Sequence, residues 1–207
     1  MIDLAHRTVF VHVPKCGGQS VEAAFCAALG LDWNRHRHLL MLMERPKGWH
    51  GRHGRLAHLR AVEYLEGGYL PVALWAEFYT FALVRNPYAR LASAWRYLRP
   101  ALDFPGFVAD LAANGLPRDG FLDPAIDYLA DEYGGLLVKD VWRLEDMPTR
   151  WPELAERAGI PGTPLPHRNK GGDPRPLVWT PAAVEAVRVI YAKDFSAFGY
   201  DPEAAPV

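Results

Sequence analysis

The chain has 207 residues, of which 50% are hydrophobic and 12% aromatic, and its formal net charge is −1. This length and composition predict one folded domain, residues 1–207, with a sizeable core. The small net charge excludes a strongly basic nucleic-acid-binding protein, so no nucleic-acid partner is expected.

The cysteine content and the hydropathy of the sequence indicate the cellular compartment of the protein. Cys16 and Cys26 fit neither a C-x-x-C pair nor a metal-ligand spacing, which argues against a disulfide framework. No apolar run approaches the roughly 20 residues that a membrane span requires, and residues 1–7 do not resemble the apolar region of a signal peptide. The sequence therefore predicts a cytoplasmic protein without a membrane span, and it gives no indication of oligomeric state.

The first predicted strand, residues 8–13, leads into a glycine-containing segment and then a helix over about residues 20–29. The segment consists of Pro14, Lys15, Cys16, Gly17, Gly18, Gln19 and Ser20. Its two glycines let backbone N–H groups approach an anion, Lys15 adds a positive charge, and the helix start adds the positive end of a dipole. Because Lys15 precedes the glycine pair, the segment departs from the G-x-x-x-x-G-K-[ST] loop. It predicts a loop for a nucleotide-like anion other than ATP or GTP, with an ordinary tight turn as the alternative.

Residues 31–57 have weak periodicity and are rich in His, Arg, Gly and Trp, which predicts an irregular insertion near the site. A short helix is expected over about residues 58–66. The basic side chains of 35–38 and 45–60 form either an acceptor-binding rim or a solvated loop. No metal site is predicted, because the histidines here are irregularly spaced. They are His36, His38, His50 and His53.

A second buried strand, residues 78–84, ends at Arg85, and a proline suited to a first helical turn starts a helix over residues 87–98. A guanidinium group binds phosphate in a bidentate manner, which makes Arg85 a candidate phosphate ligand. Ser93 lies two turns into the helix, on a face that it shares with Asn86 and Arg90.

The two strand–loop–helix units, P-K-C-G-G-Q-S and R-N-P-Y-A-R-L-A-S, resemble the nucleotide-binding segments of sulfotransferases that use 3′-phosphoadenosine 5′-phosphosulfate (PAPS). The likeness is to the carbohydrate-type, family 2-like branch, with its P-K-T-G-G-T-S and R-N-P-x-x-R-x-x-S motifs. Both motifs occurring in this order is more specific than either alone. The resemblance implies an α/β fold, a P-loop-like three-layer α/β/α sandwich with a central, mostly parallel sheet that binds its ligand at the carboxyl ends of the strands.

The resemblance also implies where the donor binds. Residues 14–20 would hold the 5′-phosphosulfate of PAPS, and Arg85 and Ser93 its 3′-phosphate. Cys16 and Gln19 stand where the family usually carries threonines, but donor binding should survive because the loop acts largely through backbone amides. The acceptor implied is a hydroxyl group of a carbohydrate or another small molecule, without a metal cofactor. Eukaryotic relatives of this branch typically carry an N-terminal anchor helix, so its absence predicts a bacterial or otherwise untethered form.

The second half of the chain continues the alternation of helices and strands. Asp103 caps a helix that ends near Asn114, and a strand is expected over residues 136–142. The R-L-E-D turn that follows resembles a family feature and precedes a helix over about 151–158. Thr180 and the following proline start the final helix.

A proline- and glycine-rich stretch contains residues 167–172, which resemble the H-x-N-x-S loop of the family with Gly171 in place of the serine. The resemblance implies that this loop closes over the cofactor and that Asn169 and Lys170 contact the nucleotide. An ordinary surface turn is the alternative interpretation.

Sulfuryl transfer is an in-line displacement for which a protein supplies positioning and charge, and Lys15 is the expected partner of the leaving phosphate. The acceptor hydroxyl needs a base, for which histidine is the first candidate. His58 is favoured because its surroundings resemble a K-H-x-T-A-like family segment, although Ala57 and Arg60 replace the lysine and threonine. The alternatives are His12, better explained as a hydrogen-bonded structural residue, and the carboxylates Glu145 and Asp146.

Two other classes of protein share the strand–loop–helix opening. A P-loop-like kinase or nucleotide hydrolase needs a lysine after the glycines and an acidic magnesium ligand ending a later strand, and neither is clear in this sequence. A non-catalytic nucleotide-binding protein would keep the loop and dispense with the base.

Overall fold

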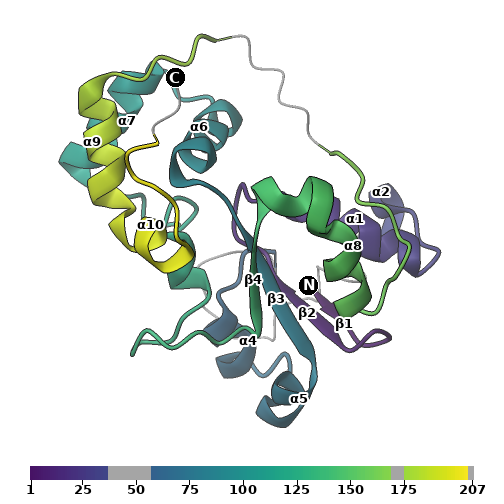
Figure 1. The fold of residues 1–207 in the computed structure, drawn as a ribbon. Coiled ribbons are helices and arrows are strands. Elements are labelled where there is room, and N and C mark those ends of the chain that lie inside the picture. Colours follow the sequence, from purple (N-terminus) through teal and green to yellow (C-terminus); the bar gives the residue numbers. More distant parts are fainter. Residues whose placement is uncertain (37–56, 169–174, 205–207) are drawn as a thin grey trace.

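The computed structural model describes residues 1–36, 57–168 and 175–204, which fold around a four-stranded sheet (Figure 1). Its strands are β1 (Ile2–Asp3), β2 (Thr8–Val11), β3 (Tyr79–Val84) and β4 (Asp140–Arg143), in that order across the sheet. Strand β1 is antiparallel to β2, whereas β2, β3 and β4 are parallel. The predicted mixed α/β class with a mostly parallel sheet is thus confirmed, and the P-loop-like three-layer sandwich stays a prediction.

The register of the parallel strands sets the position of the loops that follow them. Phe10 of β2 lies opposite Phe81 of β3, and Leu83 of β3 lies opposite Trp142 of β4. The carboxyl ends of these strands therefore meet at one edge of the sheet, where parallel sheets generally bind ligands.

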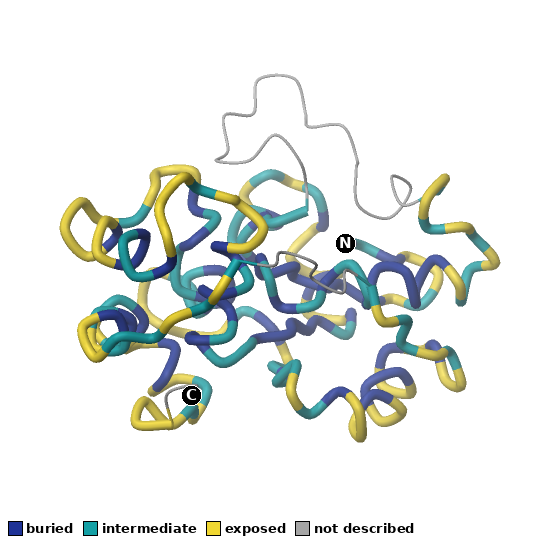
Figure 2. The backbone as a smooth tube through the Cα atoms, turned by 90° about the horizontal axis from the view of Figure 1, so that it is seen from above, coloured by how far each residue is buried: buried dark blue, intermediate teal, exposed yellow. Residues whose placement is uncertain are grey.

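One hydrophobic core surrounds the sheet. The rings of Phe10 and Phe25 lie 5.1 Å and 6.3 Å from the ring of Phe81, measured between centroids, and all three side chains are buried. Buried segments run through the middle of the molecule and exposed ones form its outer turns (Figure 2). The helices that pack on this core are α1 (Gly18–Ala28), α2 (Trp33–His36), α4 (Ala61–Glu66), α5 (Val72–Glu77) and α8 (Met147–Arg157).

A second hydrophobic core lies among helices that gather on the left of the sheet in Figure 1. Phe104 is at its centre, with its ring centroid 5.6 Å from that of Trp95 and 4.5 Å from that of Trp179. The helices that form it are α6 (Pro87–Leu98), α7 (Phe104–Asn114), α9 (Pro181–Ile190) and α10 (Ala192–Phe198). None of the helices in the described part of the chain is both long enough and apolar enough to cross a bilayer.

The starts of three helices were predicted accurately because each of these helices has a side-chain cap. Asn86, Asp103 and Thr180 accept hydrogen bonds from backbone N–H groups in the first turns of α6, α7 and α9. Helix α6 has the bounds expected from the sequence, and α7 and α9 begin directly after their predicted caps.

Several other boundaries differ from the prediction. The strand expected over 136–142 begins only at Asp140, because Leu136 forms a bridge with Ala130 and the N–H of Leu137 donates to the carbonyl of Leu129. The first strand ends at Val11, where the N–H of Val13 bends back to its carbonyl.

Two predicted helices begin at other residues than expected. The helix expected from residue 58 begins at Ala61, because His58 has a φ of 82°, which no helix accommodates. The helix expected over 151–158 starts earlier, at Met147, with a proline in its first turn. Helices α5 and α10 were not predicted, and neither was α2, which lies within the expected irregular insertion of residues 31–57.

Candidate active site

The loop of residues 14–20 follows β2 at the carboxyl edge of the sheet. Its backbone is left-handed at Lys15, with a φ of 65°, and at Gly17, with a φ of 80°. A left-handed residue other than glycine is uncommon and stores strain of about 1 kcal/mol, so the fold must impose it on Lys15. Gly17 caps helix α1, and the N–H of Ser20 donates to its carbonyl at 2.9 Å. Left-handed residues at such intervals align successive N–H groups of the loop, which creates an anion-binding concavity at the start of the helix.

Both glycines of the loop are held by close neighbours. A Cβ on Gly17 would lie 2.6 Å from Cδ1 of Leu144, which follows β4 directly. A Cβ on Gly18 would lie 2.1 Å from Nε2 of His12. The loop is therefore enclosed from two sides, and at Gly18 the reason for glycine is the imidazole ring rather than backbone freedom.

The His12 ring is fixed by a buried carboxylate. Its Nδ1–H donates to Oε1 of Glu22 at 2.5 Å, since a carboxylate only accepts, and both side chains are buried. Glu22 lies one helical turn after Gly18, so the pair joins the end of β2 to the first turns of α1. In this position His12 supports the loop, as expected of a hydrogen-bonded structural histidine.

Lys15 and Arg85 lie close enough to influence each other. Burial, and then the positive charge of Arg85, lower the pKa of the Lys15 ammonium group. Two cations in mutual repulsion at one edge of the sheet favour a polyanion that neutralises both. The Nζ atom of Lys15 lies 4.1 Å from the ring centroid of Tyr97.

The second predicted anchor starts where β3 ends. The side chain of Asn86 accepts a hydrogen bond from the N–H of Tyr88 at 3.0 Å, and the backbone N–H of Asn86 donates to Oε1 of Glu145 at 2.9 Å. The hydroxyl of Tyr200 donates to the other oxygen of Glu145 at 2.9 Å. Glu145, considered as a base, thus holds the turn at Arg85, while Ser93 lies half-buried two turns into α6.

Arg90 connects the two anchors, a role that sequence reasoning missed. Its side chain is 4% exposed, and its Nε–H donates to the carbonyl oxygen of Pro14 at 3.1 Å. Nη1 lies 3.7 Å from Asp194 of α10, whose carboxylate accepts from the N–H of Ala125 at 2.7 Å and of Ile126 at 3.0 Å. Nη2 is buried and has no hydrogen-bond partner among the described residues. Arg90 is the second arginine of the R-N-P-Y-A-R motif, and its place in that motif is the feature of the sequence that could have indicated this role.

His58 stands beside His12. Its Nδ1–H donates to the backbone carbonyl of His12 at 3.1 Å, and the two rings meet edge to face with centroids 4.4 Å apart. With the proton on Nδ1, Nε2 is the basic nitrogen of the neutral ring. The left-handed backbone at His58 is a second strained position next to the loop.

The remaining predicted donor ligands among the described residues belong to the loop itself. Cys16 is buried and its Sγ lies 3.6 Å from the carbonyl oxygen of Pro14; burial raises the pKa of this thiol to about 12. The N–H of Arg168 donates to Oγ of Ser20 at 3.3 Å, so the chain leading to residue 169 reaches the loop. Asn169 and Lys170 lie outside the described residues, and Gln19 is half-buried at the start of α1.

Within the described residues, no group of three or more His, Cys, Asp or Glu side chains is arranged to hold a metal ion. His36 lies at the end of α2, whereas His38, His50 and His53 fall outside the described residues.

Comparison with known proteins supports the motif analysis. The model of the sulfotransferase family matches residues 1–102, which include the loop, Arg85 and Ser93. No curated protein and no solved structure matches the chain. The match over residues 1–102 confirms the predicted resemblance to the sulfotransferase family. It also supports sulfuryl transfer as the general reaction.

Proposed function

We propose that this chain, with the sulfotransferase family sequence in residues 1–102, transfers a sulfuryl group from PAPS to a hydroxyl of a carbohydrate. The observation that carries the proposal is the meeting of two cationic anchors. Lys15 follows β2 and Arg85 follows β3, so both lie at the carboxyl edge of the sheet, and burial together with the positive charge of Arg85 lowers the pKa of Lys15. A donor with phosphate groups at both its 5′ and 3′ positions has charges for both anchors.

The donor is proposed to lie along the carboxyl edge of the sheet. The backbone amides of residues 14–20 and the start of α1 bind the 5′-phosphosulfate. The guanidinium of Arg85 and the hydroxyl of Ser93 bind the 3′-phosphate, where a charge-assisted hydrogen bond contributes about 1.5–3 kcal/mol.

In the proposed reaction the acceptor oxygen forms a bond to sulfur while the bond between sulfur and the bridging phosphate oxygen breaks. That electron pair stays on the phosphate, and the products are a sulfate ester and adenosine 3′,5′-bisphosphate. Lys15 and the loop amides stabilise the charge that grows on the leaving phosphate, which for one donor is worth about 3–4 kcal/mol. The hydroxyl proton passes to Nε2 of His58.

The role of His58 predicts a characteristic pH dependence. Its imidazole accepts a proton only when neutral, so sulfate transfer by the wild type should fall as pH drops below the histidine pKa. In His58→Ala this acidic limb should vanish and turnover should fall by about 10²–10⁴-fold. His36→Ala, on the short helix α2, serves as the control.

The assay uses radiolabelled PAPS with a panel of methyl pyranosides, and calorimetry measures binding of adenosine 3′,5′-bisphosphate. Binding without transfer to any hydroxyl would support a non-catalytic nucleotide-binding protein. Hydrolysis of ATP or GTP without binding of the bisphosphate would support the hydrolase alternative. Wild-type turnover in His58→Ala would exclude His58 as the base.

A further inference from the structure

Tyr97 is an exposed aromatic residue beside the proposed site. Its side chain, in the last turn of α6, is 63% exposed. One side of its ring meets Nζ of Lys15, and its ring stacks on Phe121 with centroids 5.6 Å apart and planes inclined by 23°. The exposed ring therefore lies between a cation and a second aromatic ring.

Phe121 continues this contact to the proposed base. Its ring meets the His58 ring edge to face, at 89° and a centroid separation of 6.1 Å. Lys15, Tyr97, Phe121 and His58 thus form one row, which we name the aromatic row. The groups assigned to the leaving phosphate and to the acceptor proton stand at its two ends.

An acceptor that reacts at the proposed site has to lie close to this row. Its hydroxyl must reach His58 while its oxygen faces the sulfur, which the leaving phosphate holds near Lys15. The Tyr97 and Phe121 rings link these two groups through successive contacts, and Tyr97 is exposed to solvent.

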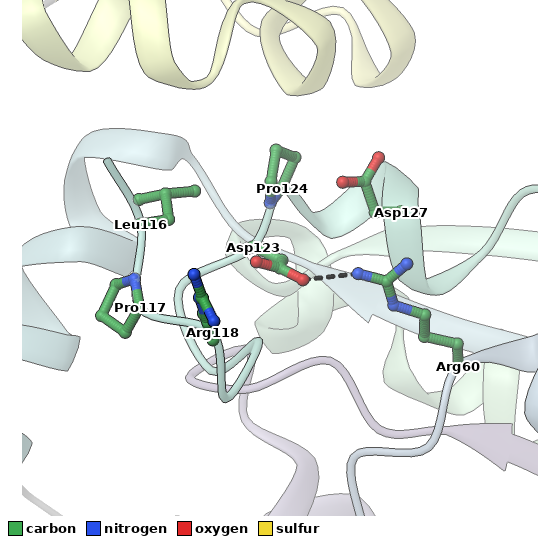
Figure 3. A pocket seen from close by; sticks show the side chains of 7 residues that line it. All are labelled: Arg60, Leu116, Pro117, Arg118, Asp123, Pro124 and Asp127. Carbon is green, nitrogen blue, oxygen red and sulfur yellow. Dashed lines mark hydrogen bonds and ion pairs between the residues drawn. The ribbon is translucent and has the colours of Figure 1, made fainter. Parts of the chain in front are cut away.

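A polar cavity adjoins the row. It has a volume of ≈ 580 Å³ and is lined by Arg60 and by the segment that carries Arg118, Asp123 and Asp127, with Asp123 between Arg118 and Arg60 (Figure 3). Arg60 follows His58 by two residues and pairs with Asp123 at 2.5 Å, and Phe121 lies in the lining segment between Arg118 and Asp123. The cavity therefore offers hydrogen-bond donors and acceptors beside the rings.

We propose that Tyr97 and Phe121 form the acceptor platform and that the cavity binds the substituents of the acceptor that are not sulfated. The inference rests on the proposed function and adds where the acceptor binds. The ligand class is a saturated ring bearing several hydroxyl groups: its C–H face packs on the aromatic rings, and its hydroxyls reach the carboxylates and guanidinium groups of the cavity. A purely apolar phenol would offer no hydrogen bonds to these charged groups.

The experiment compares Tyr97→Ala, Tyr97→Phe and the control Tyr133→Ala, whose side chain is 89% exposed between η1 (Ala125–Tyr128) and β4. Sulfate transfer to methyl pyranosides and to 4-methylphenol gives KM for each acceptor, and calorimetry gives the affinity for adenosine 3′,5′-bisphosphate. Tyr97→Ala should raise the pyranoside KM about tenfold, with Tyr97→Phe and Tyr133→Ala near wild type. Bisphosphate affinity should change less than about twofold in all three.

The outcomes separate the two proposals. A wild type that fails to bind the bisphosphate overturns the proposed function. A wild type that binds it overturns only the platform if Tyr97→Ala leaves the pyranoside KM unchanged, or if it weakens bisphosphate binding as much as acceptor binding, because Tyr97 then acts through Lys15. Preference for 4-methylphenol overturns the ligand class. Because Tyr97 is exposed, thermal unfolding of Tyr97→Ala should match the wild type.

Discussion

The two anchors of the candidate donor site are built in different ways. The loop of residues 14–20 is proposed to bind the donor through its backbone, which is left-handed at Lys15 and Gly17 and enclosed by His12 and Leu144. The second anchor, at Arg85 and Ser93, presents side chains from the start and middle of a regular helix. Donor binding at the first anchor should therefore be sensitive to added atoms, and donor binding at the second anchor to lost functional groups.

Departures from the family pattern agree with this distinction. Cys16 and Gln19 replace the usual threonines in the backbone anchor, whereas the second anchor keeps its arginine, asparagine, proline and serine. The Cys16 side chain is buried beneath the loop, where its Sγ meets the carbonyl oxygen of Pro14. A side chain in that position leaves the backbone amides of the loop unchanged.

The largest effect is expected from Gly18→Ala, which would break the first anchor. The new Cβ would lie 2.1 Å from Nε2 of His12, and the ring cannot move without losing its buried hydrogen bond to Glu22. We expect a loss of about 3 kcal/mol in the free energy of unfolding. Denaturant unfolding measures this loss, and calorimetry should show a fall of about a hundredfold or more in affinity for adenosine 3′,5′-bisphosphate.

Gly68→Ala is the matched control for that substitution. Gly68 has a φ of 66°, and an added Cβ would meet nothing within 4 Å. Its cost of about 1 kcal/mol therefore measures backbone strain alone, without an effect on bisphosphate binding. Similar results for the two variants would show that His12 does not enclose the loop.

The second largest effect is expected from Arg90→Lys, because Arg90 contacts the loop of residues 14–20 from the helix of the second anchor. In Arg90→Lys the charge near Asp194 is kept, but the planar fork that also reaches the carbonyl of Pro14 is lost. We expect a loss of about 2 kcal/mol in stability and about tenfold in bisphosphate affinity, with the acceptor KM unchanged.

Two further variants test whether Arg90 affects bisphosphate binding or only the stability of the fold. Asp194→Asn keeps the shape of the side chain and should weaken bisphosphate binding in the same direction, because Asp194 helps to fix Arg90. Arg150→Lys, in an exposed pair with Glu153, should change stability by less than about 0.5 kcal/mol. If Arg90→Lys unfolds more easily but binds the bisphosphate normally, Arg90 supports only the fold.

Local signals in the sequence were sufficient for the loop and for the capped helices. The apolar run before Pro14 and the glycine pair located the first anchor, and Asn86 located the second, because caps and glycines act on their own neighbours. Residues that act through distant partners could not be foreseen. The contact of Arg90 with Pro14 crosses 76 positions, and that of Phe121 with His58 depends on a loop without periodicity. The strand expected from residue 136 failed because its first residues pair locally with residues 129 and 130.

The smallest effect on the fold, and the most selective effect on binding, is expected from Arg85→Ala. Arg85 is half-buried at the start of α6 and is proposed to contact only the 3′-phosphate, so stability should change by less than about 0.5 kcal/mol. Affinity for adenosine 3′,5′-bisphosphate should fall about tenfold by calorimetry, because one charge-assisted contact is lost. Affinity for adenosine 5′-phosphate, which lacks the 3′-phosphate, should change less than about twofold.

The comparison of the two nucleotides makes Arg85→Ala a direct test of how the anchors divide the donor. Arg96→Ala, an exposed arginine on the same helix, controls for the loss of a positive charge. Removing Arg85 also removes the repulsion that lowers the pKa of Lys15, so that pKa should rise and Lys15 should stay protonated at higher pH. Equal losses for both nucleotides would mean that Arg85 binds the 5′ end together with Lys15, and the proposed division between a backbone anchor and a side-chain anchor would then be wrong.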